Sequence, residues 1–397
     1  MDSSKSQIKK LYYISPRDMR KNRADAVHMM YSCAAFSNHG IDVELITPKV
    51  QRKDYTLENN DIFSLYDVPE NFKITELNTK IREVNNKSSA IVVLMNRFVF
   101  NFMFILQHLS VFRHKHVVVY SKCYTSVIPY IILKFFGLIR CKLVFETPFL
   151  SNNNYHKFIM KRMHAIVVMT SHVEEFLVNT FKIPKEKIIK SPVRFQTDYQ
   201  DPTDINKAKH RNYLNWENDI KYVVYAGKTG ENLKRIQVFA EASDAFENTK
   251  FVIVGATEGL QNEYKNKDHK NLILYPFQTY PEYLKFVQAA DVLVATYEDT
   301  FYNRYTLSPG KGGAYLQSEN PVIFTDLPCL KERFPNDLVS FVAPDDSQDL
   351  IEKITHILDH YKTYKEQAKK GANFVSNKTF TDASAHILKK LNYILFS

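Results

Sequence analysis

Two lysines beside glycine-containing turns are the residues of this sequence best suited to chemistry. Lys228 lies between Gly227 and Gly230, and Lys234 follows at the expected start of a helix. Cations next to the unpaired amides of a helix start suit a diphosphate, because both place positive charge beside the phosphate oxygens. A solvated basic surface explains each lysine taken separately, so this pattern alone leaves both interpretations open.

A glycine-bearing segment further along the chain could contribute to the same site. We expect an extended turn at Ser308–Gly313, a short helix around Ala314–Gln317 and a buried strand at Val322–Thr325. Glycines let the backbone approach a ligand closely, and a lysine beside them adds a cation. A plain connecting loop is the alternative. The candidate ligand-binding residues of this segment are Ser308, Pro309, Gly310, Lys311 and Gly312.

Other candidate residues follow the ends of expected strands. Phe277 follows one such strand, and Glu298 and Asp299 follow another. In a doubly wound sheet, the loops that leave the carboxyl ends of the strands line one crevice. We therefore expect Phe277 and Glu298 beside the lysines, with Glu298 and Lys228 as the candidates for a catalytic role.

Alternating strands and helices must position these residues. The alternation occurs twice along the chain and predicts an α/β protein with two parallel sheets, each covered by helices on both faces. The strands expected in the first half are Leu11–Ser15, Ile41–Leu45, Ala90–Leu94, His116–Ser121, Lys142–Glu146 and Ala165–Thr170. Those expected in the second half are Lys221–Ala226, Lys250–Val254, Leu272–Tyr275, Asp291–Ala295, Val322–Thr325 and Ser340–Val342. The main expected helices are Ala24–Asn38, Phe98–Leu109, Ser126–Phe136, Val173–Phe181, Leu233–Ala245, Pro281–Ala289, Ser347–His360, Tyr361–Ala372 and Asp382–Phe396.

The length of 397 residues suggests two domains. Ser191–Thr203, which has two prolines and little apolar content, is the best linker candidate. We expect one Rossmann-like domain at residues 1–192, a second at 193–380, and a C-terminal helix at 381–397 that could pack back at their junction. Gln51–Lys87 is polar, and we expect a weakly ordered connection there with a small strand or two. Ser171 and Glu174 form a predicted capping box that begins a helix.

A basic loop follows the first expected strand, at the point where a doubly wound sheet opens its ligand crevice. Arg17 and Arg23 lie in this loop, and His28 follows on the first expected helix. A solvated loop explains the same arginines.

The composition of the chain limits the classes of ligand and surface that it could bind. The formal net charge of +10 favours anionic ligands or surfaces, while no nucleic-acid-binding module is visible. The four cysteines lack paired spacing, so neither a zinc cluster nor a disulfide framework is indicated, and a reducing cytoplasm fits. We see no secretory signal and no apolar run long enough to span a bilayer, so we expect a protein that does not cross the membrane.

Two stretches mix bulky apolar residues with basic ones. Asn96–His116 and Tyr130–Lys142 have the composition of segments that lie on an anionic membrane surface. Helices that cover a sheet and extend basic side chains into water explain the same composition.

The ordered set of segments resembles GT-B glycosyltransferases, specifically the retaining family 4-like group. In the second half the matching segments are Val223–Lys234 (VVYAGKTGENLK), Lys250–Gly255, Asn271–Phe277, Tyr283–Ala295, Ser308–Pro328 and Phe341–Asp346. In the first half they are Asn22–Pro48 and Ala165–Ile188. The resemblance covers nearly the whole chain apart from Gln51–Lys87.

This resemblance implies two Rossmann-like domains facing across a cleft, with the donor nucleotide held by the second. It implies an enzyme of hexosyltransferase type that moves a sugar from a nucleotide diphosphate sugar to a glycan or lipid-linked acceptor. It further implies retention, no cofactor and no metal, because the leaving diphosphate itself stabilises the transition state. In that group, residues at the positions of Lys228 and Lys234 neutralise the diphosphate, and a loop like that of Phe277 borders the base. Arg17, Arg23 and His28 become the acceptor-side candidates. The expected location is the cytoplasm, with contact at the inner face of an anionic membrane.

The sequence departs from the group at its paired glutamates, whose aligned positions are Thr306 and Ala314. The acceptor-domain histidine of the group also has no clear match, and Pro148 stands where we sought it. Glu298 could replace the missing carboxylate from a neighbouring loop. The alternative is a catalytically degenerate GT-B protein that binds a nucleotide sugar or a partner glycosyltransferase.

Overall fold

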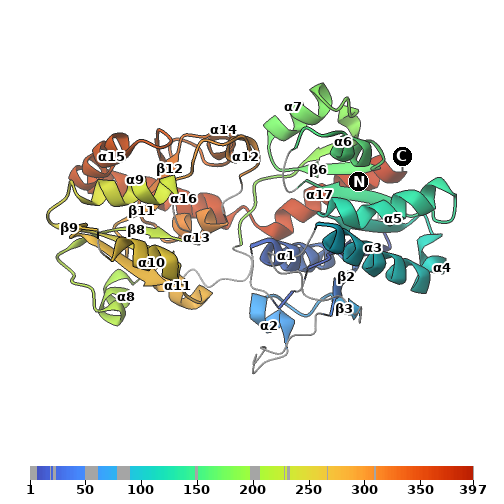
Figure 1. Cartoon of the computed structure of the whole chain (residues 1–397), viewed down its shortest axis with the longest axis horizontal. Coiled ribbons are helices and arrows are strands. Elements are labelled where there is room, and N and C mark those ends of the chain that lie inside the picture. Colours follow the sequence, from blue (N-terminus) through green and yellow to red (C-terminus); the bar gives the residue numbers. More distant parts are fainter. Residues whose placement is uncertain are drawn as a thin grey trace. The chain divides into compact units, whose positions relative to one another are not determined.

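The computed structural model describes residues 7–17, 19–20, 24–49, 61–77, 90–147, 151–196, 206–227, 229, 233–265, 267–307 and 310–396. The chain forms two compact units (Figure 1). The first unit comprises Met1–Val193 together with Phe380–Ser397, and the second comprises Arg194–Thr379. The C-terminal helix therefore belongs to the first unit.

The first unit contains a parallel sheet of seven strands in the order β3-β2-β1-β4-β5-β6-β7. The chain reverses its direction of growth between β1 and β4, the topological switch point of doubly wound sheets. The strands are nearly continuous in apolar residues because helices bury both faces. They are β1 (Lys10–Ile14), β2 (Asp42–Pro48), β3 (Lys73–Leu77), β4 (Val117–Ser121), β5 (Lys142–Glu146), β6 (Ala165–Val168) and β7 (Ile188–Lys190).

Two groups of helices cover this sheet. On one face, α1 packs against α17 although the two are far apart in sequence, and Ser384 Oγ donates to the carbonyl of Ala35 at 3.1 Å. On the other face, α3, α5 and α6 pack around a core that includes Tyr12, Phe104 and Phe145. The helices of the unit are α1 (Ala24–Asn38), α2 (Ile62–Tyr66), α3 (Ala90–Gln107), α4 (Leu109–Phe112), α5 (Tyr124–Phe135), α6 (Asn154–Lys161), α7 (Ser171–Asn179) and α17 (Phe380–Phe396).

The second unit contains a parallel sheet of six strands in the order β10-β9-β8-β11-β12-β13. All six strands expected in the second half are present, and they are β8 (Lys221–Ala226), β9 (Thr249–Ala256), β10 (Leu272–Pro276), β11 (Val292–Ala295), β12 (Val322–Thr325) and β13 (Ser340–Val342). The helices are α8 (Lys207–Leu214), α9 (Lys234–Ser243), α10 (Glu258–Tyr264), α11 (Tyr280–Ala289), α12 (Phe301–Thr306), α13 (Lys311–Gln317), α14 (Pro328–Arg333), α15 (Ser347–Asp359) and α16 (Tyr361–Ser376). Its switch point lies between β8 and β11.

Two local predictions were wrong. Ala90–Leu94 is not a strand but the first part of α3. A short apolar run has no period that separates a buried strand from a buried helix, and here the helix continues to Gln107. The predicted cap of α7 was one residue late, because the N-cap is Thr170, whose side chain accepts from the amide of Val173.

The connection after β2 is only partly described. It contains α2, with Asp61 as its N-cap, and the strand β3, as the expectation of a small strand allowed. Residues 51–60 and 78–87 lie outside the described residues.

Candidate functional site

The carboxyl ends of β8 and β11 are joined by one tyrosine from α13. The hydroxyl of Tyr315 accepts from the amide of Ala226 at 2.7 Å and lies 3.0 Å from the Ala226 carbonyl and 3.4 Å from that of Val294. Tyr315 is fully buried. It therefore fixes α13, and with it Lys311, against the strand ends on either side of the switch point.

The ammonium of Lys311 is buried at this edge. Its Nζ lies 3.9 Å from the centroid of the Tyr225 ring and 5.6 Å from that of Tyr297. Among the described residues it makes no hydrogen bond of good geometry. Burial lowers the pKa of Lys311, and the neighbouring Tyr225 phenol acts against that shift. A desolvated cation at a strand edge is a feature of functional sites.

Gly227 is the residue that covers this ammonium. Its φ of +151° is one that L side chains rarely adopt, and a Cβ added here would lie 2.9 Å from Lys311 Nζ. The backbone angle favours a glycine at this turn, and a larger residue would also displace the end of the Lys311 side chain. The predicted association of the Gly227 turn with Lys311 is thus seen as direct packing.

A second cation, Arg235, lies at the same edge, and the sequence analysis had not singled it out as a ligand. Burial acts to lower the pKa of Arg235, but Tyr225 and Glu298 outweigh it and raise the pKa. Its Nη1 lies 2.9 Å from Glu298 Oε2, and its amide donates to Glu298 Oε1 at 3.4 Å. Glu298 is therefore already engaged by an arginine of the same edge.

Tyr225 lies between the two cations. Burial would raise the pKa of its phenol, but Lys311 and Arg235 outweigh that effect and lower it. A phenol with a lowered pKa between two cations indicates a strongly positive local potential. This potential attracts an anion such as a phosphate.

The remaining described candidates lie at the same carboxyl edge. Lys234 is exposed at the start of α9, and its Nζ lies 3.5 Å from Asp345, which follows β13. Phe277 follows β10 and is 69% exposed, so its ring is available for stacking. Asp299, in contrast, is bound by Arg304 of the following helix α12.

The glycines of α13 differ in role from the expectation. The helix begins at Lys311 rather than near Ala314, so Gly312 and Gly313 are helical and buried. A Cβ on Gly312 would lie 2.6 Å from Phe334, and one on Gly313 would lie 3.0 Å from Phe195 Cβ. Packing between aromatic rings and the helix backbone explains these two glycines, whereas Gly310 is exposed with open space around it.

Several predicted site residues cannot be placed. Lys228, Ser308, Pro309 and Arg23 lie outside the described residues.

The aligned positions of the paired glutamates are not available for a ligand's hydroxyls. Thr306 donates its hydroxyl to the carbonyl of Tyr302 at 2.9 Å. Ala314 is buried within α13. No carboxylate takes their place within α13 itself.

The carboxyl edge of the first unit carries a separate polar cluster. Glu146, at the end of β5, is buried and accepts from the hydroxyl of Tyr120 at 2.8 Å. His28 Nε2 and Lys122 Nζ each lie 3.4 Å from Glu146 Oε1, and Lys122 Nζ lies 3.1 Å from His28 Nδ1. The predicted candidate His28 thus lies at the switch point of this sheet, with two charged neighbours that the sequence analysis had missed. Arg17 instead pairs with Asp25.

The described residues contain no group of three or more His, Cys, Asp or Glu side chains arranged to hold a metal ion. The cysteines at 33, 123, 141 and 329 are free thiols, and burial raises the pKa of those at 33, 141 and 329.

Sequence reasoning missed the tyrosines that surround Lys311. Tyr225 and Tyr315 read as ordinary core residues of a strand and a helix, and Arg235 reads as a neighbour of Lys234. A usable signal was the pairing of Lys311 with an aromatic residue four positions later, which places both on one side of a helix.

Comparison with known proteins agrees with the fold. Residues 220–360 match the family "Glycosyl transferases group 1". The structure is similar to a glycosyltransferase of Rickettsia africae, with a TM-score of 0.70, 14% identity and coverage of 98% of this chain and 99% of that one. It is similar to sucrose-phosphate synthase of Thermosynechococcus elongatus, with a TM-score of 0.71, 15% identity and coverage of 96% and 97%. For HepE of Anabaena in complex with UDP-glucose, the TM-score is 0.70, the identity 11% and the coverage 97% and 99%. No curated protein matches the sequence.

The whole chain has the fold of GT-B glycosyltransferases. More particularly, residues 220–360, which include Lys311 and Arg235, match the group 1 glycosyltransferase family. The expected fold and class of enzyme are confirmed.

Proposed function

We propose that this enzyme moves a sugar from a nucleotide diphosphate sugar to a glycan or lipid-linked acceptor, with retention and without a metal. The positive edge formed by Lys311, Arg235 and Lys234 would bind the diphosphate. The acceptor would lie near His28 in the first unit. A cytoplasmic location, with contact at the inner face of an anionic membrane, completes the proposal.

The buried ammonium of Lys311 under Gly227 is the observation that carries this proposal. Charge accumulates on the diphosphate as the bond to the sugar breaks. Fixed cations in a desolvated place stabilise that charge far better than water does, because they need no reorganisation. Arg235 lies beside the same tyrosine as Lys311, so both cations face one small region.

The nucleotide and the sugar are matters for experiment. HepE, which has the same fold, binds UDP-glucose, so UDP-sugars are the first donors to test. A thermal-shift screen across nucleotide sugars identifies the donor, because a ligand that binds only the folded protein raises its melting temperature.

The deciding experiment combines that donor with Lys311→Met. We expect at least a tenfold loss of transfer, about 1.4 kcal/mol, because a fixed cation beside the diphosphate no longer stabilises the charge that develops on it. Lys331→Met is the matched control, because Lys331 is an exposed lysine of the same unit paired with Asp326. Equal transfer by the wild type and both variants would remove the diphosphate from this edge.

Retention and independence of metal need separate measurements. The anomeric configuration of the product, read by NMR, tests retention. Transfer in the presence of EDTA tests the metal, and loss of activity that Mg²⁺ or Mn²⁺ restores would overturn that part.

A protein that binds the donor without turnover is the second candidate, and Ala314 favours it. A buried alanine stands where the related enzymes carry a glutamate for the ribose. Robust transfer by the purified protein excludes this candidate. Donor binding without any hydrolysis or transfer, for every acceptor tried, would favour it.

A further inference from the structure

The outer side of α3 is as apolar as its inner side. Phe100, Phe104 and Ile105 are fully buried against the sheet. A helix on the surface of a soluble protein normally turns polar residues to the solvent. On α3 the exposed positions instead form an apolar strip with helical spacing, which consists of Ile91, Val92, Met95, Phe98, Val99, Phe102, Met103 and Leu106.

The exposed apolar surface continues onto the two neighbouring helices. Ile132 and Phe135 follow one another along α5, and Phe136 adds a second ring after its end. Phe135 is 84% exposed and Phe136 is 67% exposed, values that large apolar side chains rarely reach. On α6, Tyr155 and Phe158 are also exposed.

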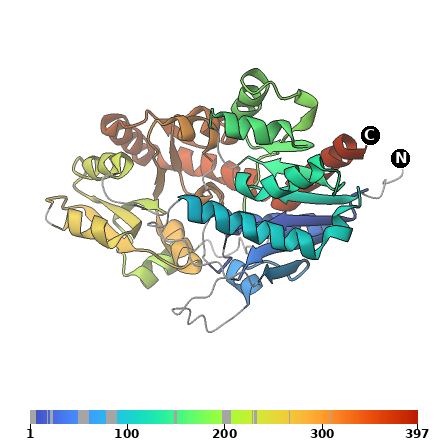
Figure 2. The ribbon, with the colours of Figure 1, turned by 45° about the vertical axis from the view of Figure 1, so that its right-hand side comes forward.

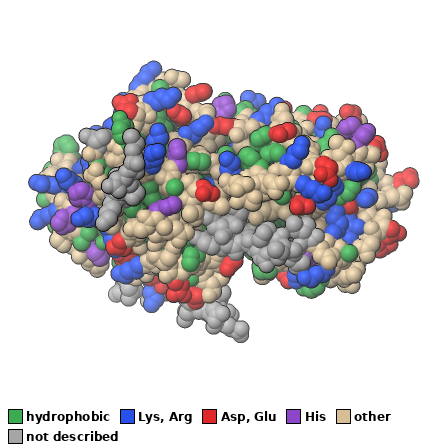
Figure 3. Space-filling model, turned by 180° about the vertical axis from the view of Figure 1, so that it is seen from behind, with side chains coloured by type: hydrophobic (Ala, Val, Ile, Leu, Met, Phe, Trp, Pro, Cys, Tyr) green, Lys and Arg blue, Asp and Glu red, His purple; other side chains and the backbone are tan. Residues whose placement is uncertain are grey.

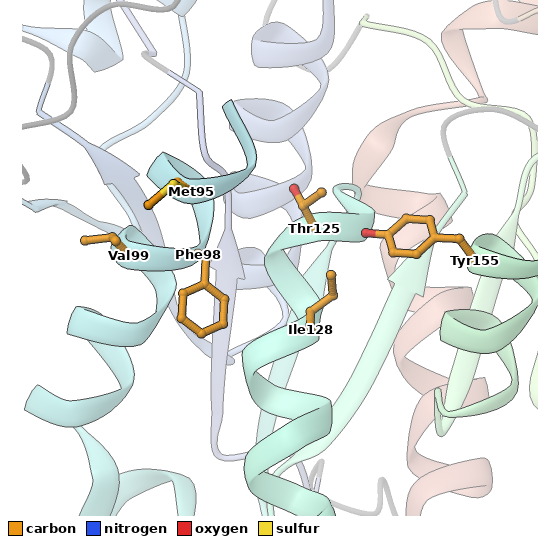
Figure 4. A pocket seen from close by; sticks show the side chains of 6 residues that line it. All are labelled: Met95, Phe98, Val99, Thr125, Ile128 and Tyr155. Atoms are coloured by element: carbon orange, nitrogen blue, oxygen red, sulfur yellow. The ribbon is translucent and has the colours of Figure 1, made fainter. Parts of the chain in front are cut away.

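A shallow hollow joins the three helices into one face. It has a volume of about 570 Å³ and is lined by Met95, Phe98, Val99, Thr125, Ile128 and Tyr155. Figure 4 shows these side chains, which come from α3, α5 and α6. In Figure 2, α3 lies along the outside of the first unit. We call the exposed apolar residues of α3, α5 and α6, with the turn after α5, the apolar face.

The charge around the apolar face has one sign. Residues 90–173 contain ten Lys and Arg but only one acidic residue, the buried Glu146. This stretch therefore carries nine of the ten net positive charges of the chain. On the right-hand part of the view in Figure 3, in contrast, basic and acidic side chains are interspersed.

Individual cations lie within and beside the apolar face. Arg97 Nη1 lies 3.4 Å from Thr125 Oγ1 at the hollow, and the Arg162 guanidinium lies 3.5 Å from the centroid of the Phe158 ring. Arg113 and Arg140 are exposed, and the amide of Arg140 donates to the carbonyl of Phe112, which brings the two together.

We infer that the apolar face is the surface by which this enzyme docks onto an anionic lipid bilayer. Apolar side chains would enter the boundary between headgroups and acyl chains, while the arginines reach the lipid phosphates. The inference rests on the proposed membrane contact and assigns it to one surface and one lipid chemistry.

On this inference the protein lies on the membrane surface and does not cross the bilayer. Within the described residues, no helix combines the length and the apolar character needed to cross a bilayer. The 18 residues of α3 span about 27 Å, and its inner side is held in the core of the first unit. The helix would therefore lie in the plane of the membrane surface.

Charge favours a bilayer over a second copy of the chain. In a dimer formed through this face, the basic residues of one copy would lie against those of the other. Residues 90–173 contain no exposed acidic residue to compensate that repulsion. A fluid anionic surface offers both an apolar layer and the opposite charge.

Flotation with vesicles tests the inference. We expect the wild type to bind vesicles of mixed phosphatidylcholine and phosphatidylglycerol and to bind pure phosphatidylcholine at least about tenfold more weakly. The double variant Phe135→Ser, Phe136→Ser should lose at least about tenfold in binding, because two rings no longer enter the bilayer. Arg113→Gln with Arg140→Gln should lose a similar factor, but only at low salt. Tyr213→Ser, at an exposed aromatic residue of the second unit, should bind like the wild type.

The outcomes separate the inference from the proposed function. If the wild type and both double variants bind vesicles equally well, the apolar face is not the docking surface, but the proposed membrane contact stands. No vesicle binding by the wild type would overturn both, whereas donor turnover in solution would still support transfer. Equal binding to neutral vesicles would overturn the anionic specificity. A dimer in solution that the phenylalanine variant abolishes, without vesicle binding, would make the face a self-association surface. Unchanged melting temperatures confirm that the variants are folded.

Discussion

Replacing Lys311 by methionine should separate stability from donor binding. The ammonium is buried and lacks a well-formed hydrogen bond among the described residues, so folding carries the cost of desolvating it. That cost is about 1–3 kcal/mol for a polar group and more for a charge. The contact with the Tyr225 ring at 3.9 Å returns about 2 kcal/mol of it. Methionine keeps the length and the ring contact without the charge.

We therefore expect Lys311→Met to raise the free energy of unfolding by about 1 kcal/mol in the absence of donor. For a unit of the size of Arg194–Thr379, this corresponds to about 2–4 °C in melting temperature. With donor present, the order should reverse, because the wild type gains stability by binding while the variant gains little.

Differential scanning calorimetry with and without the donor measures both effects on the same samples. A melting temperature lowered by the substitution would show that the ammonium has a stabilising partner. The desolvation argument would then be wrong. An equal donor-induced shift in both proteins would instead refute the role of Lys311 in binding the diphosphate.

Three further predictions follow from the packing. Gly312→Ala should lower the free energy of unfolding by about 1–3 kcal/mol in urea titrations, because its Cβ would meet an aromatic ring 2.6 Å away. Gly310→Ala is the control, because a Cβ there would meet open space. Equal effects of the two substitutions would contradict the packing argument. Glu298→Gln should cost about 1–2 kcal/mol in the same assay because the half-buried Arg235 loses its carboxylate, and no change would show that this ion pair contributes nothing. Burial, helped by nearby lysines, lowers the pKa of His164 to about 4. The unfolded chain therefore binds its proton first, so stability should fall by up to about 3 kcal/mol as the pH drops from 6.5 to 4; an unaltered slope in His164→Gln would refute this.

The sequence was enough to predict most of the fold, because the periodicity of apolar residues and the polar turns between them mark the strands and helices. Parallel strands such as β8 and β12 are short apolar runs bounded by polar turns, and the helices between them have one apolar side. All six strands of the second unit were found this way. Helix α6 was missed because it is short and its buried positions include His156, a residue that a hydrophobic pattern does not count.

The site was predictable only at the level of loops. The switch-point rule places Gly227, Glu298 and Lys311 near one edge, because the carboxyl ends of parallel strands meet there. It does not say which atoms touch. The pairing of Glu298 with Arg235 depends on where helix α9 begins. The packing of Gly312 against an aromatic ring depends on where helix α13 begins.

The one strand that proved to be helix and the inferred membrane face have a common physical origin. The first five residues of α3, Ala90–Leu94, are all apolar, so no polar position distinguishes helix from strand there. A helix with a polar outer side would have shown the helical period in this run. The exposed apolar residues further along α3 are the observation behind the inferred membrane face. If vesicle binding fails, the apolar outer side of α3 needs another partner, and the excess of basic over acidic residues in residues 90–173 favours an anionic one.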